Sequence, residues 1–263
     1  MLIPVRGGGR FLSSYRVKAG LQPQLFRNYR AAFTLAEVLI TIGIIGVVAA
    51  LTLPSLIEEH KNKEIVTALK RHYSVMGNAY QLAINESAPD TWSYSVDKEQ
   101  VSRDFADEIS KYLNVAKRFD NYTEKNMYGL TGEKVTNPTF PTVLVLNDSS
   151  KIYFGGSYFS SSCTGNARLL TVADECMWVA VDVNGDKKPN KLGDDIFYFV
   201  MTKTSYVPGG DGYWEINKCR PYKVDGHDIG HSLGCTKYVL IKENRDYFKC
   251  KTGSENICKD LKL

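Results

Sequence analysis

The chain has 263 residues and a formal net charge of +4 at pH 7, with 43% hydrophobic and 24% charged side chains. Its first 32 residues hold six basic side chains and no acidic one, which leaves 27 basic and 29 acidic groups, a net charge of −2, in the remainder. By composition, the main part of the chain therefore has no strong basic surface, which argues against nucleic acid as a partner without excluding it.

The first predicted element is an apolar span over residues 33–53, in which Glu37 is the only ionisable side chain. As a helix with a rise of ~1.5 Å per residue, this span is long enough to cross the ~30 Å hydrocarbon core of a bilayer. A carboxylate in such a span needs a partner, because even an Asp at mid-membrane costs ~2.5–3.5 kcal/mol. A cut between Ala32 and Phe33 would supply one, since the new amine would lie within about one helical turn of Glu37.

A small residue at this cut, followed by Phe33-Thr34-Leu35-Ala36-Glu37 and an apolar helix, resembles the N-terminal signature of type IV pilins and type II secretion pseudopilins. The resemblance covers residues 30–84. It implies that a prepilin peptidase removes the leader 1–32, that Phe33 becomes the N-methylated terminus, and that Glu37 helps to dock subunits into a helical filament. The implied partners are other pilin or pseudopilin subunits, in a homo- or hetero-polymer, and an inner-membrane assembly platform. Ala32 departs from the commoner glycine, and the leader is long; an ordinary signal anchor with a chance glutamate is the alternative.

The basic leader also orients the span. Because positive charge collects on the cytoplasmic side of a membrane, the leader is expected in the cytoplasm and the residues after Leu53 outside. The sequence thus predicts a single-pass protein of the cytoplasmic membrane, in contact with the lipid bilayer, whose C-terminal domain is extracytoplasmic and joins a cell-surface or periplasmic filament after assembly. A cleavable secretory signal fits less well, because the apolar region is too long.

Beyond the span, apolar residues recur at steps of four and three, the period of an amphipathic helix. They are Ile65, Leu69, Tyr73, Met76, Tyr80 and Ala83. One spine helix is therefore expected from Phe33 to about Ile84, with a membrane-spanning half at 33–53 and an amphipathic half at 54–85. Pro54 removes a backbone donor and should kink or loosen this helix.

Small residues mark one face of the membrane-spanning half. Gly43, Gly46 and Ala50 would let neighbouring spines approach closely. Small residues are also common in membrane helices for no specific reason, so both explanations stay open.

Residues 86–263 are expected to form a globular α+β domain on which the spine buries its apolar stripe. The pattern predicts a second helix within Asp97–Arg118 and strands at Thr142–Leu146, Lys151–Phe154, Met177–Val183 and Ile196–Met201, with one further strand suggested at Tyr238–Ile241. The first two strands form a hairpin, and the four together form an antiparallel sheet. The predicted fold is pilin-like, with a disulfide-tied C-terminal region after residue 213.

One loop between predicted strands carries site chemistry. Asp182, Asn184 and Asp186 alternate, and Asp194 and Asp195 return two more carboxylates. Hard oxygen donors on a turning loop suit Ca²⁺, which takes six to eight oxygens at ~2.3–2.6 Å. The loop is not an EF-hand, but it resembles the Asp-rich turn that holds calcium in some pseudopilins and pilins. The alternative is an acidic hairpin turn built on Asn184-Gly185, with carboxylates that bind only water.

All six cysteines lie in the last hundred residues, which is typical of disulfides in an exported domain. Six cysteines allow 15 pairings, and short loops favour Cys163 with Cys176, Cys219 with Cys235, and Cys250 with Cys258. A zinc site at His227, His231 and Cys235 competes with this interpretation, although Gly226, Gly230 and Gly234 interrupt the helix that such spacing requires.

No sequence signature of catalysis is present: the chain lacks a nucleophile elbow, a phosphate loop, a His-Glu-x-x-His helix and a dinucleotide fingerprint. The preferred hypothesis is a structural, non-enzymatic filament subunit of a type IV pilus or a protein-secretion pseudopilus. The first alternative is an uncleaved, membrane-anchored module that binds a ligand outside the cell. The second is an anchored metalloenzyme that uses the zinc site above. The spine alone does not distinguish secretion, adhesive, twitching and DNA-uptake filaments.

Overall fold

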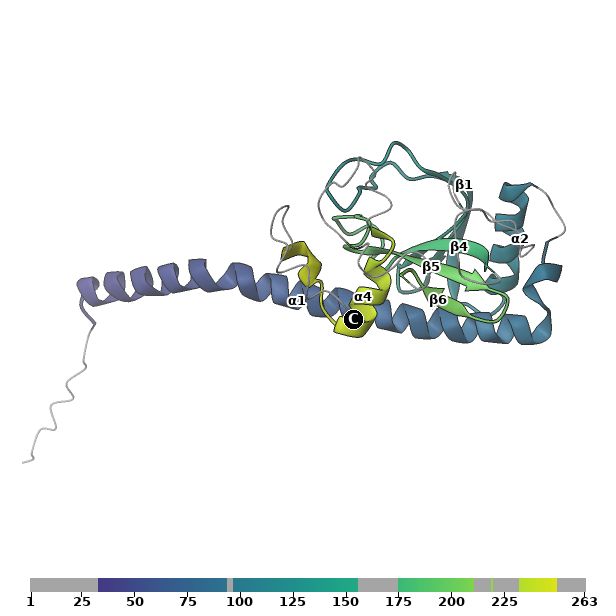
Figure 1. The fold of residues 1–263 in the computed structure, drawn as a ribbon. Coiled ribbons are helices and arrows are strands. Elements are labelled where there is room, and N and C mark those ends of the chain that lie inside the picture. Colours follow the sequence, from purple (N-terminus) through teal and green to yellow (C-terminus); the bar gives the residue numbers. More distant parts are fainter. Residues whose placement is uncertain (1–32, 94–96, 156–174, 211–218, 220–231, 250–263) are drawn as a thin grey trace, which may run out of the picture. The chain divides into compact units, whose positions relative to one another are not determined.

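The computed structural model of the chain describes residues 33–93, 97–155, 175–210, 219 and 232–249 (Figure 1). Its elements, in chain order, are α1 (Leu35–Glu86), η1 (Pro89–Thr91), α2 (Lys98–Ser110), β1 (Val115–Thr123), β2 (Thr139–Leu146), β3 (Lys151–Phe154), β4 (Glu175–Asp182), β5 (Ile196–Thr202), β6 (Tyr206–Pro208), α4 (Cys235–Lys242) and η3 (Asp246–Lys249). Contacts within the chain group into two compact units, Met1–Leu51 and Thr52–Leu263.

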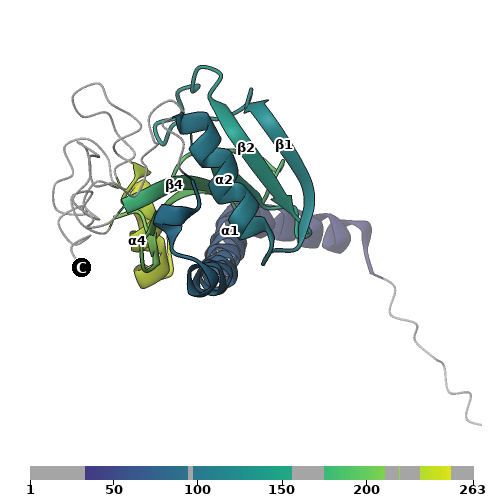
Figure 2. The ribbon, with the colours of Figure 1, turned by 90° about the vertical axis from the view of Figure 1, so that its right-hand side faces the viewer.

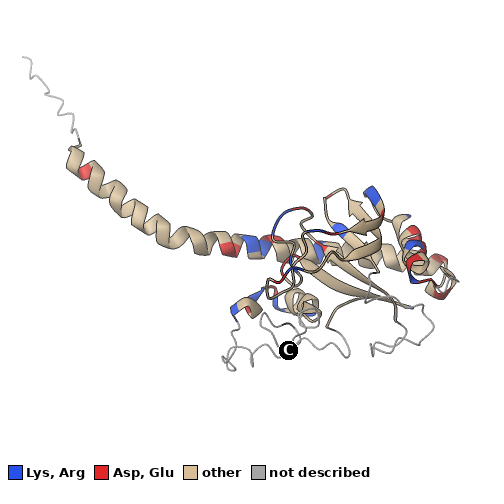
Figure 3. Ribbon diagram, turned by 90° about the horizontal axis from the view of Figure 1, so that it is seen from above, with Lys and Arg blue, Asp and Glu red and all other residues tan. Residues whose placement is uncertain are grey.

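The predicted spine helix is confirmed. α1 is a single helix of 52 residues that runs through Pro54 without a break. Within the described part of the chain it is the one helix long and apolar enough to cross a membrane, and none of its most apolar window is buried. Figure 3 shows the corresponding pattern of charge, with one acidic position near the N-terminal end of α1 and no further charge until well along the helix.

The sheet has six antiparallel strands in the order β1-β2-β3-β4-β5-β6, so every strand pairs with its predecessor in the sequence. Four of them match the predicted strands, and the α+β class with a long helix on an antiparallel sheet is confirmed. β4 and β5 are joined over their whole length, from Glu175 opposite Thr202 to Asp182 opposite Ile196. Their apolar runs reflect burial of both faces of the sheet.

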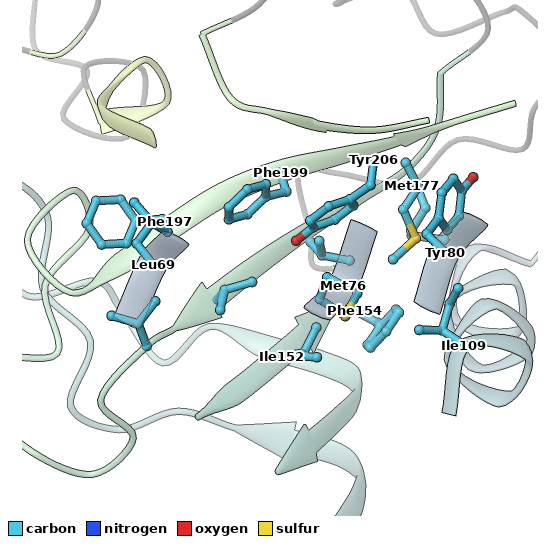
Figure 4. Close-up of a cluster of buried hydrophobic side chains, with 14 of the residues drawn as sticks. Leu69, Met76, Tyr80, Ile109, Ile152, Phe154, Met177, Phe197, Phe199 and Tyr206 are labelled. Atoms are coloured by element: carbon cyan, nitrogen blue, oxygen red, sulfur yellow. The ribbon is translucent and has the colours of Figure 1, made fainter. Parts of the chain in front are cut away.

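One face of the sheet holds the main core, where the second half of α1 and α2 pack (Figure 2). From α1 the core takes Ile65, Val66, Leu69, His72, Met76, Ala79, Tyr80 and Ala83. Figure 4 shows Leu69, Met76 and Tyr80 of α1 opposite Phe197, Phe199 and Tyr206. The predicted stripe was therefore right except at Tyr73, which is only partly buried while His72 takes the inward position.

The other face is covered by the connection between β1 and β2 and by residues around Leu233. This connection is tied to the loop after β4 by two backbone hydrogen bonds, Tyr128 N to Asn190 O at 2.9 Å and Leu192 N to Tyr128 O at 2.8 Å. The loop after β4, residues 182–195 and named the aspartate loop below, is therefore held against the connection between β1 and β2.

The helix expected within Asp97–Arg118 is confirmed as α2, which ends at Ser110. The edge strand β1 at Val115–Thr123, which pairs with β2, was not predicted. The inward residues Val101, Phe105 and Ile109 form the buried face of this helix, and the partly buried Tyr112 and Leu113 that follow it also pack against the core.

The strand suggested at Tyr238–Ile241 lies instead in the helix α4. A short apolar run does not distinguish a strand from a buried helix. Here Thr236 decides the outcome, because its hydroxyl accepts from Tyr198 N at 3.0 Å and donates to Tyr198 O at 2.8 Å, which fixes the first turn of α4 beside β5.

Candidate functional site

The start of α1 is a reciprocal pair of Thr34 and Glu37. Thr34 Oγ1 accepts a hydrogen bond from Glu37 N at 3.1 Å, while Glu37 Oε2 accepts from Thr34 N at 2.8 Å and from Thr34 Oγ1 at 2.9 Å. This is a capping box, in which each residue satisfies a backbone N–H of the helix end that would otherwise lack a partner. The positive end of the helix dipole also favours a carboxylate in the first turn.

The capping box gives Glu37 a fixed place before any second chain is present. Phe33 is the single described residue that precedes the cap, so an amine created at Phe33 would lie directly beside the box. The apolar side chains that follow are exposed within the chain, among them Leu39, Ile44, Ile45 and Leu51. A run of exposed large apolar residues marks a membrane or protein contact.

The aspartate loop is organised by Asp182 and Asp195, both fully buried. Asp182, the last residue of β4, accepts at Oδ1 from Asn184 N at 3.1 Å and from Gly185 N at 2.8 Å. Asp195 accepts at Oδ2 from Asn184 Nδ2 at 3.1 Å and from Asn190 N at 3.0 Å, and at Oδ1 from Lys191 N at 2.6 Å. All three side chains, Asp182, Asn184 and Asp195, therefore face the interior of one loop.

Asp186 and Asp194 turn away from this interior. Asp186 is exposed and forms an ion pair with Lys151, whose own side chain is buried. Asp194 forms an ion pair with the buried guanidinium of Arg245. The structure thus brings together Asp182, Asn184 and Asp195. The other two predicted ligands instead pair with the side chains of Lys151 and Arg245.

Two oxygens of the loop remain without hydrogen-bond partners among the described residues, Asp182 Oδ2 and Asn184 Oδ1, and both are buried. Burial, together with the neighbouring Asp195 carboxylate, raises the pKa of Asp182 to about 8. Burial also raises the pKa of Asp195, against the hydrogen bonds that it accepts. A buried oxygen with no donor is costly, so this site favours a proton or a cation.

The residues that the structure describes contain no group of three or more His, Cys, Asp or Glu side chains arranged to hold a metal. A cation in this loop would therefore depend on two carboxylates and an amide oxygen, completed by backbone or water oxygens. Ca²⁺ accepts such mixed oxygen sets, whereas Mg²⁺ demands a stricter geometry.

The expected disulfide between Cys219 and Cys235 is present, and Cys176 is also disulfide-bonded. Because Cys235 is in a disulfide, it is not available as the third ligand of the zinc site considered above. His227, His231, Cys163, Cys250 and Cys258 lie outside the described residues.

Sequence reasoning missed three residues of these sites. The role of Thr34 was readable, because Thr-x-x-Glu before an apolar run is the pattern of a capping box. Lys151 and Arg245 gave no signal, since nothing in the sequence relates a strand lysine or a C-terminal arginine to aspartates 35 and 51 residues away.

Comparison with known protein families finds two matches. Residues 27–53 match the prokaryotic N-terminal methylation motif. Residues 55–256 match a family of unknown function, DUF6613. The chain belongs to the DUF6613 family. No curated protein and no solved structure matches it.

The methylation motif and the DUF6613 region meet at Pro54, three residues after the end of the first compact unit. The motif match confirms the prepilin-type signature recognised in the sequence. It implies processing by a prepilin peptidase and pilin-type assembly, and together with the apolar helix it makes this DUF6613 protein a membrane-anchored, extracytoplasmic, pilin-like protein.

Proposed function

We propose that this DUF6613 protein is a structural subunit of a type IV pilus-like or type II secretion filament, assembled through α1. The observation that carries the proposal is the capping box at the start of an exposed apolar helix, within a prepilin-type motif. The box holds the Glu37 carboxylate at the end of α1, where an amine at Phe33 of the same or a neighbouring chain reaches it. Removal of residues 1–32 and N-methylation of Phe33 belong to this proposal.

Intact mass of the protein purified from its host tests the processing step. Loss of residues 1–32 with one added methyl group at Phe33 is the expected result. A chain that keeps Met1 to Ala32 and stays monomeric contradicts the proposal and favours the uncleaved, membrane-anchored binding module.

Glu37→Gln separates the two roles of Glu37. A glutamine at this position keeps an oxygen for the capping box but has no charge to pair with an amine. We expect Glu37→Gln to insert into the membrane and to lose filaments, while Glu59→Gln, on the exposed surface of the same helix, assembles normally. Normal filaments from Glu37→Gln would show that the charge is not needed for assembly.

We also propose that Asp182, Asn184 and Asp195 hold a structural Ca²⁺. The supporting observation is the pair of buried, unpartnered oxygens in one loop, Asp182 Oδ2 and Asn184 Oδ1. When bound, the ion would supply a positive charge directly against Asp182 and Asp195, while Lys151 and Arg245 continue to neutralise Asp186 and Asp194.

Thermal unfolding of the full chain in detergent, with and without Ca²⁺, tests this site. A ligand at 100 times its dissociation constant stabilises by about 2.7 kcal/mol. We expect a rise in Tm with Ca²⁺ that Asp182→Asn abolishes and Asp186→Asn, the matched change on the same loop, retains. A wild-type Tm that does not respond to Ca²⁺ would refute the proposal.

A further inference from the structure

Lys151 lies directly opposite Asp182 in the sheet. Lys151 is the first residue of β3 and Asp182 is the last residue of β4, and the two are cross-strand partners. Their side chains therefore emerge on the same face of the sheet, with Cβ atoms about 4.5–5.5 Å apart. The side chain of Lys151 is buried, with 8% of it exposed. A buried ammonium group thus stands beside one of the carboxylates that line the aspartate loop.

Three carboxylates lie within the range of this ammonium group. Lys151 Nζ pairs with Asp186 and lies 3.9 Å from Glu124 Oε2. Asp182 is the third, since it is the cross-strand partner, and its Oδ2 is buried without a hydrogen-bond partner among the described residues. Burial raises the pKa of Asp182, and the charge of Lys151 is one of the influences that oppose this rise. The electrostatic contact between the two groups therefore already exists.

The three carboxylates differ in how much each needs the ammonium group. Asp186 is 92% exposed, so water solvates its charge when the lysine leaves. Glu124 is buried but accepts hydrogen bonds from the hydroxyls of Tyr122 at 3.1 Å and Tyr153 at 3.3 Å. A buried carboxylate oxygen that has no donor gains most from a positive charge. Asp182 is therefore the carboxylate at which the ammonium group stabilises the chain most.

We propose that the Lys151 ammonium group competes with Ca²⁺ for Asp182, so that either the lysine or the ion neutralises this carboxylate. This inference rests on the Ca²⁺ site proposed above and names the residue that sets its affinity. When the ion binds, Lys151 pairs with Asp186. A lysine side chain is long and flexible enough to exchange between two carboxylates while the backbone stays in place. Because the ion has to displace one positive charge, the loop favours a divalent cation over Na⁺ or K⁺.

Isothermal titration calorimetry of the full chain in detergent with Ca²⁺ tests the competition. Lys151→Met removes the ammonium group and keeps a long side chain. We expect Lys151→Met to bind Ca²⁺ at least tenfold more tightly than the wild type. An affinity of Lys151→Met that equals or falls below that of the wild type would overturn the proposal.

Two control variants separate the position of the charge from its mere presence. Lys187→Met removes an exposed lysine of the same loop, and it should bind Ca²⁺ within twofold of the wild type. Lys151→Arg keeps the positive charge, and it should bind Ca²⁺ no more tightly than the wild type. A tenfold gain in affinity for either control would contradict the specific role of the Lys151 ammonium group.

Thermal unfolding distinguishes competition from a purely structural role. Without Ca²⁺, Lys151→Met should have a lower Tm than the wild type, because its buried carboxylates lose a positive charge. Saturating Ca²⁺ should then raise the Tm of Lys151→Met by more than it raises that of the wild type. If Lys151 only supports the fold, the variant loses stability and its response to Ca²⁺ does not grow. Lys151→Gln, which is also neutral, replaces Lys151→Met with the same expectations if the latter does not fold.

The Ca²⁺ site and the competition fail in different ways. If neither the wild type nor Lys151→Met binds Ca²⁺, both proposals are wrong. If the wild type binds Ca²⁺ and Lys151→Met binds it no more tightly, only the competition is wrong. If Lys151→Met binds Ca²⁺ and the wild type does not, the competition is right, and in the wild type the lysine itself takes the place of the ion.

Discussion

Protonation of His72 should weaken the packing of α1 on the sheet. The side chain is 5% exposed, its Nε2 lies 3.2 Å from the Tyr206 hydroxyl, and its Nδ1 has no hydrogen-bond partner among the described residues. The ring also packs on Phe199, with centroids 5.6 Å apart. Burial lowers the pKa of His72 from 6.5 to about 3, a shift that the Asp148 carboxylate partly opposes.

The loss of stability follows from the different pKa values in the two states. In the unfolded chain the histidine takes up a proton near pH 6.5, whereas in the folded chain it stays neutral down to about pH 3. The free energy of unfolding therefore falls as the pH falls through this window, by about 1.4 kcal/mol per pH unit. Between pH 6.5, where the unfolded histidine is half protonated, and pH 4.5 this one side chain removes about 2.3 kcal/mol, a large part of the about 5–15 kcal/mol typical of a folded protein.

Urea unfolding of the full chain in detergent, followed by tryptophan fluorescence at pH 6.5 and 4.5, measures this effect. His72→Gln keeps a hydrogen-bonding group near Tyr206 but does not titrate, and His60→Gln changes an exposed histidine of the same helix. We expect the wild type and His60→Gln to lose about 2.3 kcal/mol more than His72→Gln over this range. The same pH dependence in His72→Gln and the wild type would refute the reasoning.

Three further outcomes are expected. Gly185→Ala should destabilise the domain by more than Gly132→Ala in urea unfolding. Both glycines have positive φ, which costs an alanine about 1 kcal/mol of strain, but a Cβ at Gly185 would also clash with Ser149 O, whereas a Cβ at Gly132 would meet no atom. Equal losses of stability would contradict this. Arg245→Met should lower the free energy of unfolding by about 3 kcal/mol, because it leaves the Asp194 carboxylate unpaired and removes the 2.7 Å hydrogen bond from Arg245 Nε to Asn62 Oδ1. Lys70→Met, which breaks an exposed ion pair with Glu243, should lower it by less than about 1 kcal/mol in the same assay. Thr34→Val should destabilise the start of α1 by about 1 kcal/mol and speed amide hydrogen exchange there about fivefold, as measured by NMR in micelles. Thr34→Ser should leave the exchange rate unchanged. An unchanged rate in both variants would show that the cap does not stabilise the helix end.

The elements that could be predicted from the sequence are those with a repeated local pattern. The stripe from Ile65 to Ala83 follows the helical period because one side of α1 is buried, and the runs at β4 and β5 are apolar because both of their faces are covered. The prepilin-type motif was readable for the same reason, since the expected cleavage position, Glu37 and the apolar span all lie within one short segment.

The features that were missed depend on partners distant in sequence. β1 is a mostly exposed edge strand with an irregular pattern of side chains, and only its pairing with β2 defines it. The helical state of α4 depends on Thr236 and the backbone of Tyr198, and the directions of Asp186 and Asp194 depend on Lys151 and Arg245. The five candidate oxygen ligands look equivalent in the sequence. Long-range ion pairs separate Asp186 and Asp194 from the three that face the interior of the loop.

The order of the strands has a consequence for export. Because β1 to β6 pair strictly with their predecessors, a domain that crosses the membrane in sequence order after α1 delivers each strand when its preceding neighbour is already across. The order in which the strands are synthesised and exported is then also the order in which they pair, so no strand depends on a partner that is distant in sequence. A meander of this kind suits a protein that has to mature on the far side of a membrane, where cytoplasmic chaperones and ATP are absent.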